Sequence, residues 1–227
     1  MNKGNGTALI ALEAVTAALE PSTGLTSTKL AKAAIDHLSA WSVENRIKAI
    51  HEAGHAGLAC LVRIGVKEID IKGSAQGHTT TDLGDDDQSA FVTASRSRDT
   101  MVMSLGGYHA ETVLLGEPSV GSSTDIERVC AMALSYCTSW MGGAITLPSS
   151  PWGYGSTPTS VIDAQAVEVA RLVRDASDRA RGLVEEHKTQ IMELAKAIYG
   201  ERRLTDGPLD AALRAAGFEP ARLSESA

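Results

Sequence analysis

Residues 49–57 of the chain read AIHEAGHAG, which places His51 and His55 four residues apart and Glu52 directly after the first histidine. Apolar side chains recur around this stretch every three or four residues, and the pattern predicts a helix with one buried face from about Ser42 to Ile64. Residues i and i+4 lie side by side on a helix, so two imidazoles at this spacing can reach one zinc ion. The alternative is a pair of core histidines satisfied by hydrogen bonds.

Outward from this helix, the pattern indicates short strands and further helices. The alternation in VKEIDIK predicts a strand over residues 66–72, and GHTTT predicts a second short strand over 77–81. Further helices are expected at 96–115, from Thr124 to Met141, at 161–199 and at 208–216. Aromatic residues make up only 4% of the chain while Ala and Leu are abundant, which favours helices over a large sheet.

Two local features of the predicted helices need an explanation. Gly106 and Gly107 lie inside the helix expected at 96–115, where each glycine costs about 1 kcal/mol relative to alanine. The close approach of another helix is the simplest reason for them. Thr124 and Glu127 have the spacing of a capping box, which would place Asp125 in the first turn of the next helix.

Composition limits the classes of function. The chain has 227 residues, of which 43% are hydrophobic, and its formal net charge of −7 gives no basis for binding nucleic acid. The apolar run from Thr7 to Leu19 is too short to span a bilayer and contains Glu13, so we expect neither export nor membrane insertion. Three cysteines without paired spacing are expected to be reduced core side chains, which indicates a cytoplasmic protein. They are Cys60, Cys130 and Cys137.

A catalytic zinc ion takes three protein ligands and keeps a further position for water. Beside the two histidines, the candidates for the third ligand are Glu111, which follows the glycine pair, and Asp125. Asp125 could instead simply suit the positive end of a helix dipole, and Glu111 could be an exposed carboxylate or a partner that orients a ligand. Spacing alone leaves the choice open.

Three linked motifs carry a family resemblance. They are HEAGHA at 51–56, LGGYHAE at 105–111 and GEPSVGSSTDIERV at 116–129, and a looser match continues through LTDGPLDAAL at 204–213. In this order and at these separations the chain, over roughly residues 44–217, resembles the protease domain of the FtsH-type zinc metalloproteases.

The resemblance implies a mainly helical, zincin-like metalloprotease domain with a small β-sheet, whose edge strand near residues 77–81 holds an extended substrate peptide. It also implies that His51, His55 and Asp125 bind Zn²⁺ and that Glu52 is the catalytic base, which leaves Glu111 as a partner that orients a ligand. In that chemistry zinc lowers the pKa of its water, and Glu52 takes the proton and later passes it to the leaving amine. We assign no catalytic role to His78 or His109.

Residues 1–40 form a predicted N-terminal helical extension without a motif, and we expect the peptidase domain over 41–220 and a tail over 221–227. The family's transmembrane helices and ATPase domain have no counterpart in this sequence, and no G-x-x-x-x-G-K-[ST] loop is present. We therefore expect a zinc metalloendopeptidase that hydrolyses unfolded or flexible polypeptides without ATP. The alternatives are a protease subunit that works with a separate ATPase, and a catalytically silent, zinc-stabilised regulatory module.

Overall fold

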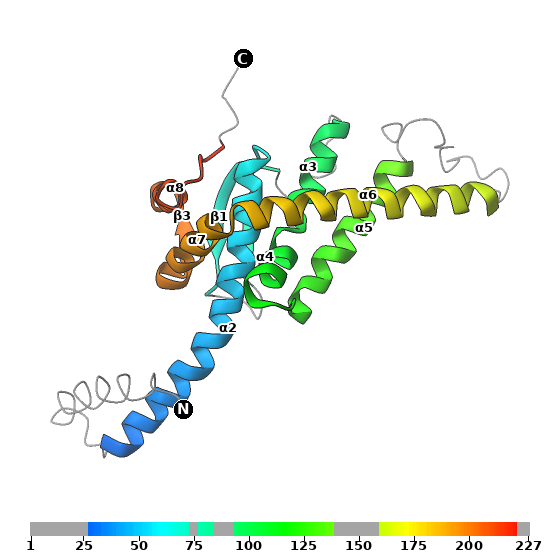
Figure 1. Ribbon diagram of the computed structural model, residues 1–227. Helices are drawn as coiled ribbons and strands as arrows, with labels where there is room; N and C mark the ends of the chain where they lie inside the picture. The colour runs from blue at the N-terminus through cyan, green and yellow to red at the C-terminus, as the bar shows by residue number, and fades with distance from the viewer. Residues whose placement is uncertain (1–26, 73–76, 84–92, 139–158, 222–227) are drawn as a thin grey trace. The chain divides into compact units, whose positions relative to one another are not determined.

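The structure is a computed structural model that describes residues 27–72, 77–83, 93–138 and 159–221 (Figure 1). It is mainly α-helical with one small antiparallel sheet, which confirms the predicted fold class. The helices are α2 (Ser27–Leu61), α3 (Ala94–Ser104), α4 (Gly106–Leu115), α5 (Ser123–Thr138), α6 (Thr159–Glu186), α7 (Lys188–Glu201) and α8 (Asp206–Ala215), with a 3₁₀ turn η1 (Val120–Ser122). The strands are β1 (Val66–Asp70), β2 (His78–Thr81) and β3 (Arg203–Thr205).

The chain divides into two compact units, Met1–Asn45 and Arg46–Ala227, and the sheet and the candidate site lie in the second. The division expected from the sequence, at 1–40, 41–220 and 221–227, stays a prediction. Residues 1–26, which include most of the helical extension expected over 1–40, lie outside the described residues. No helix in the described part of the chain is both long and apolar enough to cross a membrane.

Helix α2 carries the stretch AIHEAGHAG, but its bounds differ from those predicted. It runs without a break from Ser27, so Ser42 lies inside the helix and is not its N-cap. No glycine or proline lies between residues 27 and 53, and nothing in that stretch opposes a continuous helix. The helix ends before Gly65 because Arg63 adopts a left-handed conformation with φ of 59°, and the Ile64 amide donates to the carbonyl of Ala59 at 2.8 Å.

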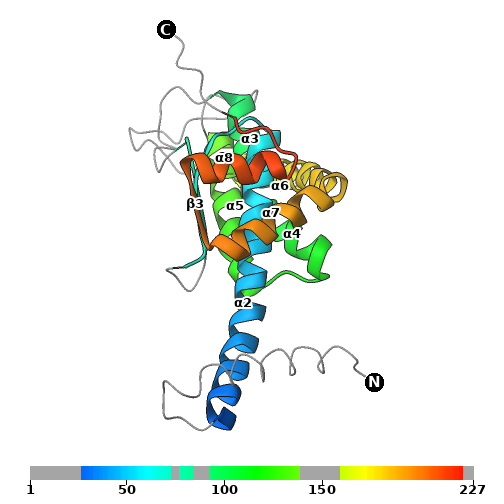
Figure 2. The same cartoon turned by 90° about the vertical axis from the view of Figure 1, so that its left-hand side faces the viewer.

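The sheet has the strand order β2-β1-β3, and both pairings are antiparallel. Ile69 of β1 faces Thr79 of β2 on one side and Leu204 of β3 on the other. Ile69 and Leu204 are buried, while Glu68 and Asp70 alternate with Ile69 along the strand. Helix α8 contacts β1 and β3, and α7 also contacts β3 (Figure 2). In the order β2-β1-β3, the strand β2, which was predicted from GHTTT, is one edge of the described sheet.

The region expected to be a single helix over 96–115 is two helices. Leu105 separates α3 from α4 with φ of −90° and ψ of 0°, outside the helical range. This break allows α4 to cross α2 at a contact between glycines: a Cβ added to Gly54 would meet the carbonyl oxygen of Gly106 and would lie 2.6 Å from Cβ of Ala110. The close helix approach predicted from the glycine pair is confirmed. Helix α6 packs across α3, α4 and α5 and completes the core (Figure 1).

Candidate metal centre

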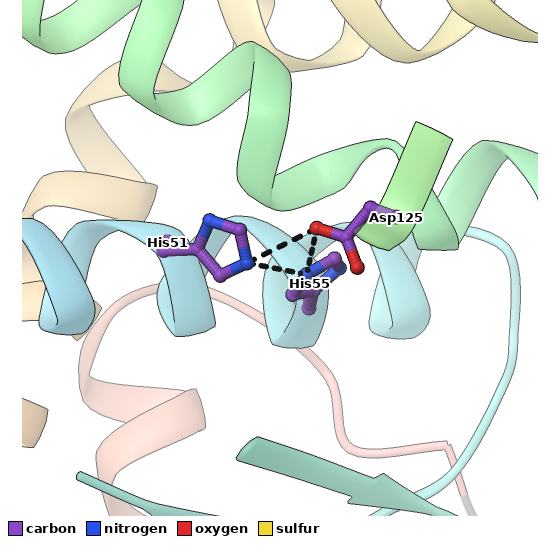
Figure 3. A group of neighbouring side chains, drawn as sticks. All are labelled: His51, His55 and Asp125. Carbon is purple, nitrogen blue, oxygen red and sulfur yellow. Dashed lines mark hydrogen bonds and ion pairs between the residues drawn. The ribbon is translucent and has the colours of Figure 1, made fainter. Parts of the chain in front are cut away.

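Three potential ligand atoms meet between α2 and the first turn of α5 (Figure 3). Nε2 of His51 lies 3.0 Å from Nε2 of His55. Oδ2 of Asp125 lies 3.1 Å from Nε2 of His51 and 3.2 Å from Nε2 of His55. Residues 70 positions apart in the sequence are thus brought to one point, and the side chains of all three are largely buried.

Asp125 reaches this point because η1 leads the chain directly into α5. A carboxylate in the first turn of a helix is favoured by the positive end of the helix dipole. The predicted capping box is wrong, since Thr124 lies inside α5 and its hydroxyl donates to the carbonyl of Gly121 at 2.9 Å. The helix begins one residue earlier than expected, at Ser123.

The far nitrogen of each imidazole is held by an acceptor. Nδ1 of His51 lies 2.6 Å from Oε1 of Glu111, and Nδ1 of His55 lies 3.0 Å from the backbone carbonyl oxygen of Met103. A carbonyl oxygen can only accept, so Nδ1 of His55 carries the proton that it donates. The carboxylate of Glu111 sets the same tautomer for a neutral His51. Both Nε2 atoms then present lone pairs to Asp125.

Three electron-rich atoms at these distances repel one another unless a cation lies among them. Within the described residues, Oδ2 of Asp125 is buried and forms no hydrogen bond. Ligands around a tetrahedral ion with bonds of 2.0 to 2.1 Å are about 3.3 Å apart, close to the separations observed here. Two imidazole nitrogens and one carboxylate oxygen therefore form a donor set that fits a zinc-sized cation.

The charges of the site also favour a cation. Burial disfavours protonated His51, but the neighbouring carboxylates of Asp125 and Glu111 raise the pKa of His51 to about 10. Burial likewise disfavours ionised Asp125, but the two imidazoles hold the pKa of that carboxyl well below its usual range. The cluster is thus stable only with a positive charge at its centre, which a proton or a metal ion can supply.

Glu111 lies on the opposite side of His51 from Asp125. It is almost fully buried and accepts hydrogen bonds from the backbone amide of Ser119, from the hydroxyl of Ser119 at 3.1 Å and from the hydroxyl of Ser122 at 3.2 Å. Burial raises the pKa of Glu111, but His51 and the amide and hydroxyl of Ser119 together lower it. Of the two carboxylates considered for the third ligand, the structure places Asp125 against both Nε2 atoms and Glu111 against Nδ1 of His51.

Glu52 is also buried, with 3% of its surface exposed. The hydroxyl of Thr79 on β2 donates to Oε2 of Glu52 at 2.7 Å. The Glu52 charge is close enough to His51 to contribute to the raised pKa of that histidine. The carboxylate thus lies between the sheet edge and the histidine pair.

Several contributors to the site could not be identified from their residue types. Met103 acts through its backbone carbonyl, which leaves no trace in the sequence. Gly107 is needed because an added Cβ would lie 2.5 Å from Cε1 of His51, so it also makes room for the imidazole. Ser119, Ser122 and Thr79 are common polar residues, and only their contacts with Glu111 and Glu52 single them out.

The two histidines that received no catalytic role lie outside this cluster. His109 is buried in α4, with its Nε2 2.9 Å from the hydroxyl of Ser177. His78 is exposed on β2 opposite Asp70, and together with Glu68 these side chains form a second group of potential ligand atoms. Nε of Arg203 lies 2.7 Å from Glu68 and 3.6 Å from Asp70, so a guanidinium already balances those carboxylates.

The three cysteines are free, as expected, but only two of them are core residues. Cys60 and Cys137 are buried, whereas Cys130 is exposed on α5. The expectation that all three are buried is therefore wrong for Cys130. It lies beside Val129, which takes the inward position on this helix. Burial raises the pKa of the Cys60 thiol to about 11.

The model of peptidase family M41 matches residues 40–209 of the chain. The chain is 34% identical over 176 residues to the ATP-dependent zinc metalloprotease FtsH 2 of Symbiobacterium thermophilum, covering 72% of this chain and 29% of that protein. It is 29% identical over 182 residues to the FtsH of Acidothermus cellulolyticus, covering 72% and 27%. With FTSH 3, mitochondrial, of Arabidopsis thaliana it shares 29% identity over 195 residues, covering 81% and 23%. The match thus spans about a quarter of each of these relatives.

Proposed function

This chain belongs to peptidase family M41, and from that premise we propose that it is a zinc-dependent metalloendopeptidase. His51, His55 and Asp125 hold Zn²⁺, Glu52 is the catalytic base, and Glu111 orients His51. The relatives named above are called zinc metalloproteases, which supports zinc as the metal.

One observation carries the proposal: two Nε2 atoms and one carboxylate oxygen converge within 3.2 Å of one another while acceptors hold both Nδ1 atoms. A structural zinc site normally closes its fourth position with a protein ligand. Here the described residues supply three ligand atoms. The buried carboxylate of Glu52, which directly follows His51 in the sequence, is not one of them. This combination favours a catalytic centre over a purely structural one.

Each residue has a defined task in peptide hydrolysis. When bound, zinc supplies Lewis acidity, which lowers the pKa of water and polarises a carbonyl group. Glu52 takes the proton of the attacking water and passes it to the nitrogen of the leaving amine. Glu111 and the Met103 carbonyl fix the two imidazole rings, so their Nε2 atoms stay directed at the metal.

The substrate class follows from the sheet edge. Among the described strands β2 pairs only with β1, so its other edge can take an extended peptide as an added strand. A folded domain cannot offer such a segment without opening, so unfolded or flexible polypeptides are the expected substrates. Hydrolysis itself requires a metal, a base and water, and we propose that it proceeds without ATP.

The relatives' names favour a second candidate. They are called ATP-dependent, and a separate ATPase that unfolds and delivers substrates would make this chain a protease subunit. A silent regulatory module is less consistent with Glu52, because a module without hydrolysis has no need of a base beside the metal. Three free cysteines suit a reducing compartment, and we propose a cytoplasmic location.

The test is hydrolysis of an unstructured, casein-like polypeptide by the purified chain without nucleotide. We expect cleavage that a chelator abolishes and zinc restores, and a Glu52→Gln variant that keeps its zinc but loses at least about a hundredfold in rate. Absence of cleavage by the zinc-loaded chain would overturn the proposal. Cleavage only after a separate ATPase and ATP are added would favour the second candidate.

A further inference from the structure

Strand β2 and the residue directly before it both approach the buried carboxylate of Glu52. The hydroxyl of Thr79 donates to Oε2 of Glu52 at 2.7 Å and lies 3.4 Å from the backbone carbonyl oxygen of the same residue. A hydroxyl has one proton to donate, and the shorter contact to the charged oxygen is the stronger bond. Thr79 therefore ties the end of the Glu52 side chain to the sheet.

Gly77 makes the second contact. A Cβ added at this position would lie 2.7 Å from Oε1 of Glu52 and 2.8 Å from its Cγ. Real side chains do not approach so closely, so any larger residue at position 77 would displace the carboxylate. Gly77 and Thr79 together fix the place of both carboxylate oxygens.

We propose that Thr79 is a positioning residue for the catalytic base, holding the Glu52 carboxylate in place by its hydroxyl while Gly77 leaves the room that the carboxylate needs. The proposal rests on the role of Glu52 given above. A glutamate side chain has several rotatable bonds, and a displacement of the base by about 1 Å greatly lowers the rate of catalysis. A fixed carboxylate oxygen leaves the other oxygen in a defined position for the proton.

The same strand is the one proposed to hold the substrate peptide. Because Thr79 lies on β2, the segment that fixes the peptide also fixes the base, and the distance between them is set by a few residues of backbone. Thr189 is an exposed threonine on α7 and belongs neither to the sheet nor to the ligand cluster. The two threonines thus give a matched pair, one against the base and one away from it.

The experiment compares Thr79→Val, Thr79→Ser and the control Thr189→Val in the zinc-loaded chain, with an unstructured peptide as substrate. Thr79→Val keeps the shape and β-propensity of threonine and removes the hydroxyl. We expect it to lower kcat about tenfold or more, with KM within about twofold of the parent value and zinc content unchanged. Thr79→Ser should restore most of kcat, and Thr189→Val should match the parent chain.

Equal kinetics for Thr79→Val and Thr189→Val would overturn the proposal, as would a loss confined to KM. Should Thr79→Val fail to fold, Thr79→Ala removes the same hydroxyl and takes its place, with the same expectation.

A second readout does not depend on peptidase activity. Thr79→Val, Glu52→Ala and the double variant form a thermodynamic cycle on the melting temperature of the chain as purified. We expect Thr79→Val to lower the melting temperature clearly when Glu52 is present and much less when Glu52 is alanine. Equal shifts in both backgrounds would overturn the proposed contact. Because the cycle requires no catalysis, it separates a failure of this proposal from a failure of the proposed function.

Discussion

Asp125 and Glu111 both contact His51, but at opposite nitrogens, and this difference is the basis of the roles proposed for them. Asp125 lies against Nε2 of His51 and of His55, whereas Glu111 lies against Nδ1 of His51 and is held by Ser119 and Ser122. A carboxylate at the metal supplies a bond and a charge. A carboxylate behind an imidazole sets only its orientation and basicity.

This difference predicts unequal losses of metal affinity. Asp125→Asn should weaken zinc binding more than a hundredfold because it removes a charged ligand, and Glu111→Gln should weaken it about 10- to 100-fold because only the support of His51 changes. Titration against a zinc-binding dye measures both. If Glu111→Gln loses zinc while Asp125→Asn keeps it, the two roles are reversed.

The cysteines provide a second prediction at this scale. Thiolates react and thiols do not, and burial both raises the pKa of Cys60 and shields Cys137. Native labelling with an alkylating reagent should modify Cys130 rapidly and the other two only after unfolding. Mass spectrometry of the labelled peptides gives the order, and comparable rates for Cys60 and Cys130 would show that the α2 core is open.

The sequence predicts the site residues that lie on one helix better than those that other helices bring to the site. His51, Glu52 and His55 stand out because a helix brings residues four apart together, which requires no knowledge of the rest of the fold. The choice between Asp125 and Glu111 depends on how α4 and α5 pack against α2, and spacing leaves it open. The Met103 carbonyl is invisible for the same reason, since it is identified only by its contact with His55.

At the scale of elements, the crossing of α2 and α4 holds the histidine pair against its neighbours. A Cβ added to Gly106 would lie 2.5 Å from the carbonyl oxygen of Gly54. Because this neighbour is a backbone atom, a larger residue could be accommodated only by moving the two helices apart. Gly107 lies in the next position and makes room for His51. The crossing therefore fixes both the packing of the helices and the place of the first imidazole.

This contact predicts opposite effects for two glycine substitutions. Gly54→Ala should lower the free energy of unfolding by about 1 to 3 kcal/mol or more, because overpacking between backbones outweighs the better helix propensity of alanine. Gly182→Ala on α6, where an added Cβ meets nothing within 4 Å, should raise it by up to about 1 kcal/mol. Urea unfolding of both variants measures the difference, and a Gly54→Ala chain as stable as Gly182→Ala would contradict the crossing.

The bounds of some helices cannot be predicted from the periodicity of apolar residues. The strands β1 and β2 and the glycine contact are predictable, since alternation and helix-breaking residues are local signals. The break at Leu105 is not, because the flanking apolar pattern continues through it and only the crossing with α2 requires the change of direction. Likewise Ser42 has the residue type of an N-cap, yet the strong helix formers before it extend α2 through this position.

At the scale of the whole molecule, zinc would join elements that are far apart in the chain. Its proposed ligands come from α2 and α5, and α5 also packs against α3 and α6. A metal that binds the folded state in preference to the unfolded one stabilises the fold in proportion to its concentration relative to Kd. Family membership, the convergence of the three ligand atoms and the charge of the cluster all support the presence of this ion.

Metal analysis of the purified 227-residue chain tests the central claim most directly. We predict about one zinc per chain, retained in Glu52→Gln because the base is not a ligand, and lost in a variant that replaces both His55 and Asp125. A chain that carries no zinc and takes none up when zinc is supplied would contradict the account, and so would zinc bound equally well without His55 and Asp125.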